Sequence, residues 1–123
     1  MIEHRTLINS FKYAIAGLSF AVKHNQNIKI HIIAAVLVIL LSIILKVNRF
    51  EMGILGIMIL LVISTEMINT SIEEMTNLIT NEHRKEAKIA KDVAAGMVLI
   101  TSLGSVAVGV LILLPYILKA LNI

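Results

Sequence analysis

Five polar side chains recur at helical spacing in the middle of the chain: Glu66, Asn69, Thr70, Glu73 and Asn77. At ~100° per residue they fall within an arc of ~100° on one helix face, with the two carboxylates ~10 Å apart along the axis. One carboxylate could hold a hard cation such as Mg²⁺, which takes oxygen ligands and keeps phosphate oxygens in its shell. The other could accept a proton from an alcohol. The pattern therefore predicts a site for phosphoryl transfer.

Opposite charge follows shortly downstream of this polar face. Lys88, Lys91 and Asp92 are spaced at i, i+3 and i+4, so a helical turn would present them together. Lysines beside a metal-binding carboxylate are typical of a polyphosphate site, because positioning and charge neutralisation are most of what phosphoryl transfer requires. Two alternatives stay open: the polar face could join helices by hydrogen bonds, and the lysines could anchor lipid headgroups.

The composition indicates where such a site would lie. Of the 123 residues 58% are hydrophobic and 15% are charged, and the mean hydropathy is +0.91. Soluble domains are about 45–50% apolar and about 25% charged, so this chain is too apolar for a water-soluble or a disordered protein. The absence of cysteine excludes a disulfide scaffold and a thiol nucleophile. A net charge of +3 with only two Tyr and three Phe favours an anionic membrane surface, and no nucleic acid, as partner.

Three apolar stretches, at residues 28–47, 50–79 and 93–121, are long enough to cross a membrane. A helix needs ~20 residues to span the ~30 Å hydrocarbon core, and none of the stretches alternates with the period of a strand. We therefore expect a single all-α integral membrane domain over residues 1–123, in which residues 80–92 connect the second and third membrane helices.

The N-terminal segment, residues 1–25, is too polar to span. Its apolar residues recur at spacings of three and four, with Arg5, Asn9 and Lys12 toward the other side: Leu7, Ile8, Phe11, Ile15, Leu18 and Val22. One apolar stripe on a polar helix predicts an amphipathic helix that lies on the membrane surface.

The Lys and Arg residues predict the orientation of the chain in the cell membrane. Eight lie on the side of the N-terminus and of residues 80–92: Arg5, Lys12, Lys23, Lys29, Arg84, Lys85, Lys88 and Lys91. Three lie on the other side: Lys46, Arg49 and Lys119. Because basic residues accumulate in cytoplasmic loops, we expect the N-terminus and the site to be cytoplasmic and the C-terminus to lie outside.

Two runs of residues match the motifs of a known family. Residues 66–73, E-M-I-N-T-S-I-E, resemble the E-x-x-N-(T/S)-A-I-E signature of the prokaryotic diacylglycerol kinase family. Residues 87–96, A-K-I-A-K-D-V-A-A-G, resemble its A-K-x-A-K-D-x-A-A-G segment. Residues 10–18 resemble the surface helix of the family, and residues 27–31 resemble the N-F-x-x-H that opens the first span in Gram-positive members. The similarity covers nearly the whole chain.

The resemblance implies a homotrimer of three-span subunits, with active sites between subunits near the cytoplasmic face. Such a protein transfers the ATP γ-phosphate to a lipid alcohol and uses Mg²⁺. By motif, Glu66 would be the general base on the lipid hydroxyl, and Asn69 would orient the nucleotide site. Glu73 would bind the metal that bridges the phosphates, while Lys91 and Asp92 would contact the nucleotide.

Two further positions match the nucleotide cleft of the family: Tyr13 on the surface helix and Glu82 in the connection. The Gram-positive branch is similar to undecaprenol kinases, so the expected product is undecaprenyl phosphate. Diacylglycerol, which would give phosphatidic acid, is the alternative, because both substrates present one primary hydroxyl at the interface.

The chain departs from the family pattern at two places. Asn25 stands where the family has a glutamate that serves as a second metal-binding carboxylate, and Asn77 stands where it has an aspartate. The Asn25 carbonyl could still bind Mg²⁺ as a neutral donor, or Glu74 could substitute for the missing carboxylate. A non-catalytic membrane subunit of the same fold is a second hypothesis. An ion or proton carrier is disfavoured, because the polar face lies on one span only.

Overall fold

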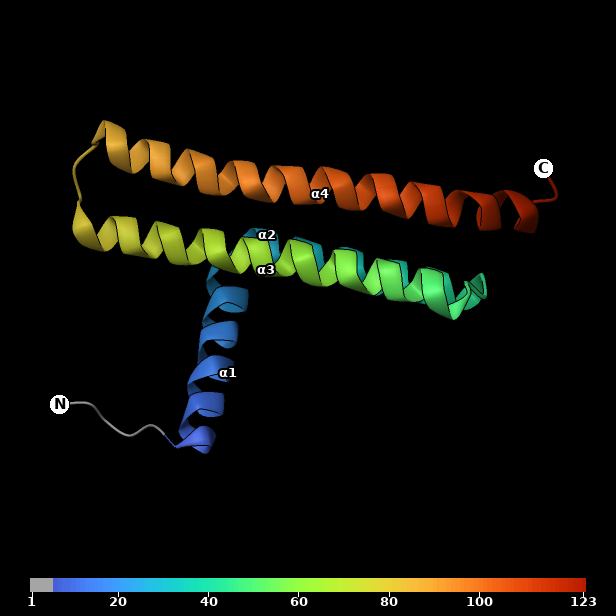
Figure 1. The fold of residues 1–123 in the computed structure, drawn as a ribbon, viewed down its shortest axis with the longest axis horizontal. Helices are drawn as coiled ribbons and strands as arrows, with labels where there is room; N and C mark the ends of the chain where they lie inside the picture. Colours follow the sequence, from blue (N-terminus) through green and yellow to red (C-terminus); the bar gives the residue numbers. More distant parts are fainter. Residues whose placement is uncertain (1–5) are drawn as a thin grey trace.

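The computed structural model describes residues 6–123, which form four helices joined by short turns (Figure 1). α1 is Leu7–His24, α2 is Gln26–Ile44, α3 is Arg49–Ile79 and α4 is Lys85–Ala120. Between residues 6 and 123 there is no strand, and the predicted all-α class is confirmed. Residues 1–5, which belong to the predicted surface segment and include Arg5, lie outside the described range.

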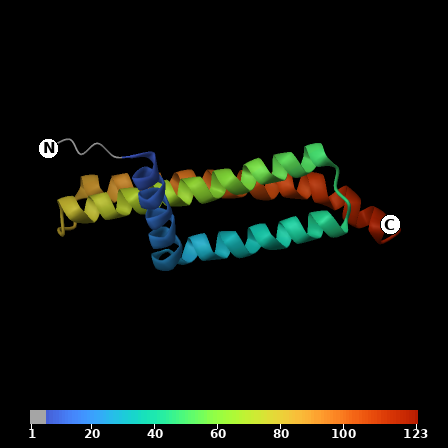
Figure 2. The same ribbon diagram turned by 90° about the horizontal axis from the view of Figure 1, so that it is seen from below.

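The helices α2, α3 and α4 are each long and apolar enough to cross a membrane, which confirms the three expected spans. With 19 residues, α2 is ~30 Å long and matches the hydrocarbon core. With 31 and 36 residues, α3 and α4 are longer than that core requires. Figures 1 and 2 show α3 and α4 side by side along their length, and α2 packs on another side of α3.

The helix α1 runs across the three-helix bundle instead of along it (Figure 2). It begins after Thr6, whose hydroxyl accepts a hydrogen bond from the Asn9 N–H at 3.4 Å. Large apolar side chains along α1, among them Ile8, Phe11 and Ile15, remain exposed. A crosswise helix with an exposed apolar stripe is what a position in the membrane interface requires, in agreement with the sequence.

Asn25 forms the joint between α1 and α2. Its backbone is extended, with φ −109° and ψ 112°, and its N–H bonds to the Ala21 carbonyl at 2.9 Å. Its side-chain oxygen caps α2 by accepting from the N–H of Asn27 at 2.8 Å and of Ile28 at 3.4 Å. One residue therefore ends the crosswise helix and starts the first membrane helix.

The turn between α2 and α3 lies at the opposite end of the bundle. Lys46 adopts a left-handed φ of 54°, and Asn48 then caps α3 by accepting from the Glu51 N–H at 2.9 Å. Tyr116 of α4 donates to Glu51 Oε2 at 2.5 Å, which ties the end of α4 to this turn. The buried apolar core lies beside it and comprises Val47, Leu55, Ile112 and Leu113.

The connection between α3 and α4 is shorter than the hydropathy of the sequence suggests. The helix α4 begins at Lys85, whereas the third apolar stretch begins at Val93. The non-helical part of this connection is therefore residues 80–84, within which the Thr80 hydroxyl accepts from the Glu82 N–H at 3.1 Å. The basic residues downstream belong to α4 and lie beside the last turns of α3.

Candidate active site

Glu66 is a carboxylate buried inside the bundle, with 1% of its surface exposed. It projects from α3 toward the joint between α1 and α2. Asn25 Nδ2 donates to its Oε2 at 3.2 Å, and His31 Nε2 lies 3.6 Å from its Oε1. A buried carboxylate is unfavourable unless polar groups face it, so these two residues are what stabilise Glu66 in this place.

The Asn25 side chain has protein partners at both ends of its amide. Nδ2 donates to Glu66 and also to the Thr70 hydroxyl, at 2.7 Å. Oδ1 caps α2. The Thr70 hydroxyl in turn donates to the backbone carbonyl of Glu66 at 2.9 Å. Asn25, Glu66 and Thr70 thus form one hydrogen-bonded network that joins the start of α2 to α3.

Asn69 and Glu73 lie on the same face of α3, toward the end that precedes the α3–α4 connection. Asn69 Nδ2 donates to Glu73 Oε1 at 3.2 Å. Asn69 is 6% exposed, and its buried Oδ1 has no hydrogen-bond partner within residues 6–123. A buried carbonyl oxygen without a donor is unfavourable by ~1–3 kcal/mol, so it is suited to a cation.

These two residues offer a hard cation the oxygens that it takes. Mg²⁺ in kinases is bound by one or two carboxylates and is completed by phosphate oxygens and water. The Glu73 carboxylate and the unpaired Asn69 oxygen fit that donor set. In the described part of the chain, no cluster of three His, Cys, Asp or Glu side chains forms a closed metal site.

Lys91 extends the polar face of α3 onto α4. Its Nζ donates to Asn77 Oδ1 at 2.7 Å, and Asn77 follows Glu73 by one helical turn. Lys88 and Asp92 form an exposed ion pair one turn apart on α4. The polar face of α3, with the Glu73 carboxylate and the amides of Asn69 and Asn77, is therefore continued on α4 by the ammonium group of Lys91.

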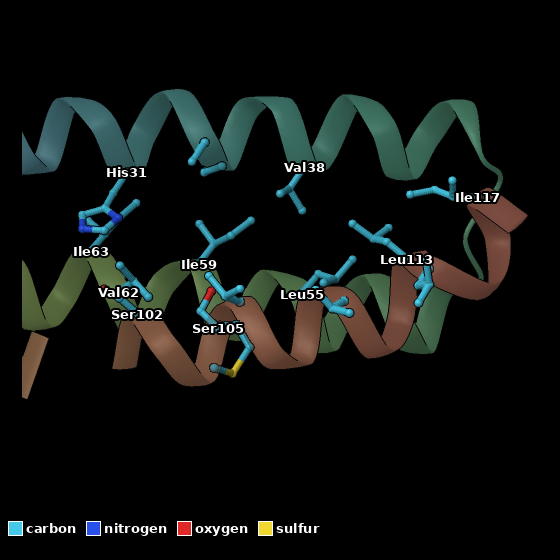
Figure 3. A pocket seen from close by; sticks show the side chains of 17 residues that line it. His31, Val38, Leu55, Ile59, Val62, Ile63, Ser102, Ser105, Leu113 and Ile117 are labelled. Atoms are coloured by element: carbon cyan, nitrogen blue, oxygen red, sulfur yellow. The ribbon is translucent and has the colours of Figure 1, made fainter. Parts of the chain in front are cut away.

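An apolar groove of about 410 Å³ leads away from the buried carboxylate. It lies over α3 between α2 and α4, and its wall is apolar except at His31, Ser102 and Ser105. Figure 3 shows His31 at one end of the groove and Ile117 at the other. Because His31 also contacts Glu66, the groove joins a buried carboxylate to a hydrocarbon-lined space inside the membrane spans.

The model of one protein family matches residues 12–113 of the chain, and its description is prokaryotic diacylglycerol kinase. The chain belongs to this family. The matched range includes the candidate site on α3 and most of the residues that line the groove, but not Leu114 and Ile117. The surface-helix residues before residue 12 and the end of α4 lie outside the match.

Three relatives are similar to this chain over most of its length. The chain is 38% identical over 114 residues to a diacylglycerol kinase of Synechocystis sp., with 92% of this chain and 65% of that protein covered. It is 34% identical over 117 residues to the undecaprenol kinase of Bacillus subtilis, with 92% and 95% covered. It is 30% identical over 94 residues to a diacylglycerol kinase of Haemophilus influenzae, with 76% and 80% covered. The chain thus spans about two thirds of the length of the first relative and nearly all of the second.

Within this family member, the structure brings some of the expected site residues together and leaves others apart. Asn69 contacts Glu73, and Lys91 reaches α3 through Asn77. Glu82 lies in the α3–α4 connection, where its carboxylate pairs with Arg84 Nε at 3.2 Å. Tyr13 lies on α1, on the crosswise part of the fold.

His31 is a site residue for which the sequence predicted a hydrogen bond but no partner. Its type and its place near the start of the first span suggest an interfacial or interhelical hydrogen bond. The structure gives the partner, since His31 faces Glu66 and lines the groove. Its one signal in the sequence is that it is a titratable residue inside an apolar stretch.

Proposed function

We propose that the protein is an ATP- and Mg²⁺-dependent kinase that phosphorylates a lipid alcohol of the membrane. The observation that carries this proposal is the buried carboxylate of Glu66, which contacts His31 at the end of an apolar groove. A lipid alcohol could keep its hydrocarbon chain in the groove and bring its hydroxyl to Glu66 from within the bilayer. A water-soluble substrate has no need of such a route.

In this mechanism Glu66 is the general base. Its carboxylate accepts the proton of the lipid hydroxyl while the hydroxyl oxygen attacks the γ-phosphorus of ATP. A bond forms between that oxygen and phosphorus, the bond from phosphorus to the β–γ bridging oxygen breaks, and ADP leaves. Transfer is direct, since the two substrates approach one site from the membrane and from the aqueous side.

The residues nearer the α3–α4 connection would hold the nucleotide. Glu73 and the unpaired Asn69 oxygen would bind Mg²⁺, which neutralises phosphate charge when it is bound. The ammonium group of Lys91 would contact the phosphates, with Asp92 beside it on α4. Tyr13 and Glu82 would line the nucleotide cleft, as the family motifs imply.

The lipid alcohol that we propose is undecaprenol, with undecaprenyl phosphate as product. The Bacillus subtilis relative, of which the chain covers 95%, is an undecaprenol kinase. The groove between α2 and α4 would give the hydrocarbon chain of this substrate an apolar lining. Diacylglycerol is the second candidate, because it is the substrate named for the Synechocystis and Haemophilus relatives.

The assembly that we propose is a homotrimer, as the resemblance to the family implies. Support comes from the many large apolar side chains that α3 and α4 expose, of which neighbouring copies could cover a part. Cross-linking of the protein in native membranes would give a ladder that ends at three subunits. A ladder that stops at one or two would contradict the trimer.

A competition assay tests the function and the substrate together. Purified protein receives ATP, Mg²⁺ and equal amounts of undecaprenol and diacylglycerol in mixed micelles, and both phosphorylated lipids are quantified. We expect undecaprenyl phosphate to dominate. Excess phosphatidic acid would establish the second candidate, and the absence of both products would favour a non-catalytic member of the fold.

Replacement of Glu66 by Gln serves as the internal control of this assay. The amide keeps the shape of the side chain but cannot accept the proton, so turnover should fall by ~10²–10⁴-fold. Glu86→Gln is the matched variant, because Glu86 is an exposed carboxylate on the first turn of α4. Equal turnover of the Glu66 and Glu86 variants would remove Glu66 as the base.

A further inference from the structure

We infer that Asn25 is a positioning residue, which fixes the Glu66 carboxylate in the orientation that the reaction needs. The inference rests on the proposed role of Glu66 as the base. It also gives Asn25 a task other than metal binding, although its place in the family pattern suggests a metal ligand. The argument follows from the hydrogen bonds of its amide group.

The orientation of the Asn25 amide is determined by the helix that it caps. Oδ1 accepts from the backbone N–H groups of Asn27 at 2.8 Å and Ile28 at 3.4 Å. If the amide were turned over, its NH₂ group would face these two donors and lose both bonds. The cap therefore directs Nδ2 away from α2 and toward α3.

Nδ2 uses both of its protons on α3. One goes to the Thr70 hydroxyl at 2.7 Å and the other to Glu66 Oε2 at 3.2 Å. The Thr70 hydroxyl can accept, because its own proton goes to the Glu66 backbone carbonyl. Asn25 is thus fully satisfied by protein groups, and its Oδ1 has two backbone donors where a cation would need a free lone pair.

The two oxygens of Glu66 are distinguished by these contacts. Oε2 is held by Asn25, whereas Oε1 faces His31, which lines the apolar groove. The Oε1 atom is therefore the one that a hydroxyl arriving through the groove would meet. Without the Asn25 bond the carboxylate could rotate, and this difference between its two oxygens would be lost.

The absence of charge on the Asn25 side chain matters as much as the hydrogen bond that its Nδ2 donates to Glu66. A carboxylate in its place would lie against Glu66 at hydrogen-bond distance, and two negative charges so close repel unless a cation or a proton lies between them. The Asn25 amide has the shape of an aspartate carboxylate, but it is uncharged and donates a hydrogen bond to Glu66. A change to Asp or Glu should therefore weaken the enzyme, whereas a chain that had merely lost a metal ligand would regain activity.

The test compares Asn25→Asp with Asn27→Asp in the purified full-length protein. Asp keeps the cap oxygen but loses the donor, while Asn27 is exposed on the first turn of α2 and offers the same change of charge. We expect Asn25→Asp to lower kcat by ~100-fold, as a misplaced catalytic group does, with the KM for ATP unchanged. Asn27→Asp should leave both constants near the wild-type values.

A second measurement separates positioning from metal binding without turnover. Mn²⁺ replaces Mg²⁺ in the presence of a non-hydrolysable ATP analogue, and its affinity is followed by electron paramagnetic resonance. Equal affinity in wild type and Asn25→Asp supports positioning. Tighter Mn²⁺ binding by Asn25→Asp, or a kcat that is unchanged or raised, would overturn the inference.

Asn25→Ser covers the case in which the Asp variant does not fold. Serine keeps a capping oxygen on α2, but its side chain is too short to reach Glu66. We expect it to lose kcat as Asn25→Asp does while its thermal unfolding in detergent remains a single cooperative transition, which shows that the variant folds. A wild-type protein without kinase activity would instead contradict the proposed function, whereas an active wild type with an active serine variant contradicts only the role of Asn25.

Discussion

Lys91 Nζ donates to Asn77 Oδ1 at 2.7 Å, a contact that joins the first turns of α4 to the last turns of α3. The family pattern has an aspartate where this chain has Asn77. With an amide as partner, the ammonium charge of Lys91 is not neutralised by this contact, and it remains available to a phosphate. The ammonium group of Lys91 thus lies next to the polar face of α3 with its charge available to a phosphate.

The first prediction concerns this lysine. Lys91→Ala should lower kcat/KM for ATP by ~10–100-fold, because a hydrogen bond to a charged group contributes ~1.5–3 kcal/mol. The KM for the lipid should not change. Lys88→Ala is the comparison, since Lys88 is already paired with Asp92. A loss of equal size in both variants would indicate general attraction of the nucleotide by surface charge.

The second prediction concerns the metal. Glu73→Gln removes the carboxylate that is hydrogen-bonded to Asn69, so the Mg²⁺ concentration for half-maximal activity should rise by ~10-fold or more. Glu86→Gln, on the exposed start of α4, should leave the Mg²⁺ dependence as it is. The measurement is initial rate against free Mg²⁺ at saturating lipid. An unchanged Mg²⁺ curve for Glu73→Gln would exclude this residue as a ligand.

Much of this arrangement could be predicted from the sequence, because lipid restricts the choice. A chain in hydrocarbon must satisfy its backbone internally, so three long apolar stretches can only be helices. The helical period then places Glu66, Asn69 and Glu73 on one face. In the structure Glu66 on that face meets Asn25 at the start of α2, and Asn77, one turn beyond Glu73, meets Lys91 of α4.

The start of α4 could not be predicted from hydropathy. An apolar stretch marks the part of a helix that lies in hydrocarbon, and it gives no signal where the same helix continues into water. For this reason the third apolar stretch begins at Val93 while α4 begins at Lys85. The difference matters, because it makes the lysines of this segment part of a rigid helix beside α3.

The contacts of Glu66 also could not be predicted from the sequence. Asn25 and Glu66 are 41 residues apart, and nothing in the spacing of either motif relates them. Their contact depends on the turn at Asn25 and on how α2 packs against α3. Both are tertiary features. The family pattern alone therefore suggested a metal ligand at Asn25, where the packing shows a hydrogen-bond donor to Glu66.

The third prediction concerns the orientation in the membrane. Eight of the eleven Lys and Arg residues lie on the side of the N-terminus and the α3–α4 connection, so this side should face the cytoplasm. Alkaline phosphatase fused after Ile123 should be active, since it requires the outside of the cell, and a fluorescent protein fused there should be dark. The reverse pattern would place the C-terminus in the cytoplasm and overturn the assignment.

The fourth prediction concerns the end of the bundle that is remote from the site. Tyr116 donates to Glu51 Oε2 at 2.5 Å and accepts from the backbone N–H and from Nδ2 of Asn48, each at 3.3 Å. Tyr116→Phe removes all three bonds, so the free energy of unfolding in detergent should fall by ~1–3 kcal/mol. Kinase turnover should be unaffected below the unfolding temperature. A large loss of turnover in a folded variant would show that this end is coupled to the site.

The last prediction concerns the groove. Gly109 lines it from α4, and a Cβ added there meets no other atom within 4 Å, so Gly109→Leu should fold and fill part of the groove. If the groove holds the hydrocarbon chain of the substrate, the KM for undecaprenol should rise by ~10-fold or more while the KM for ATP stays constant. Gly53→Leu is the matched control, because Gly53 is exposed on α3, lies outside the groove and has equal space. Equal lipid KM values for the two leucine variants would show that the chain of the substrate lies elsewhere.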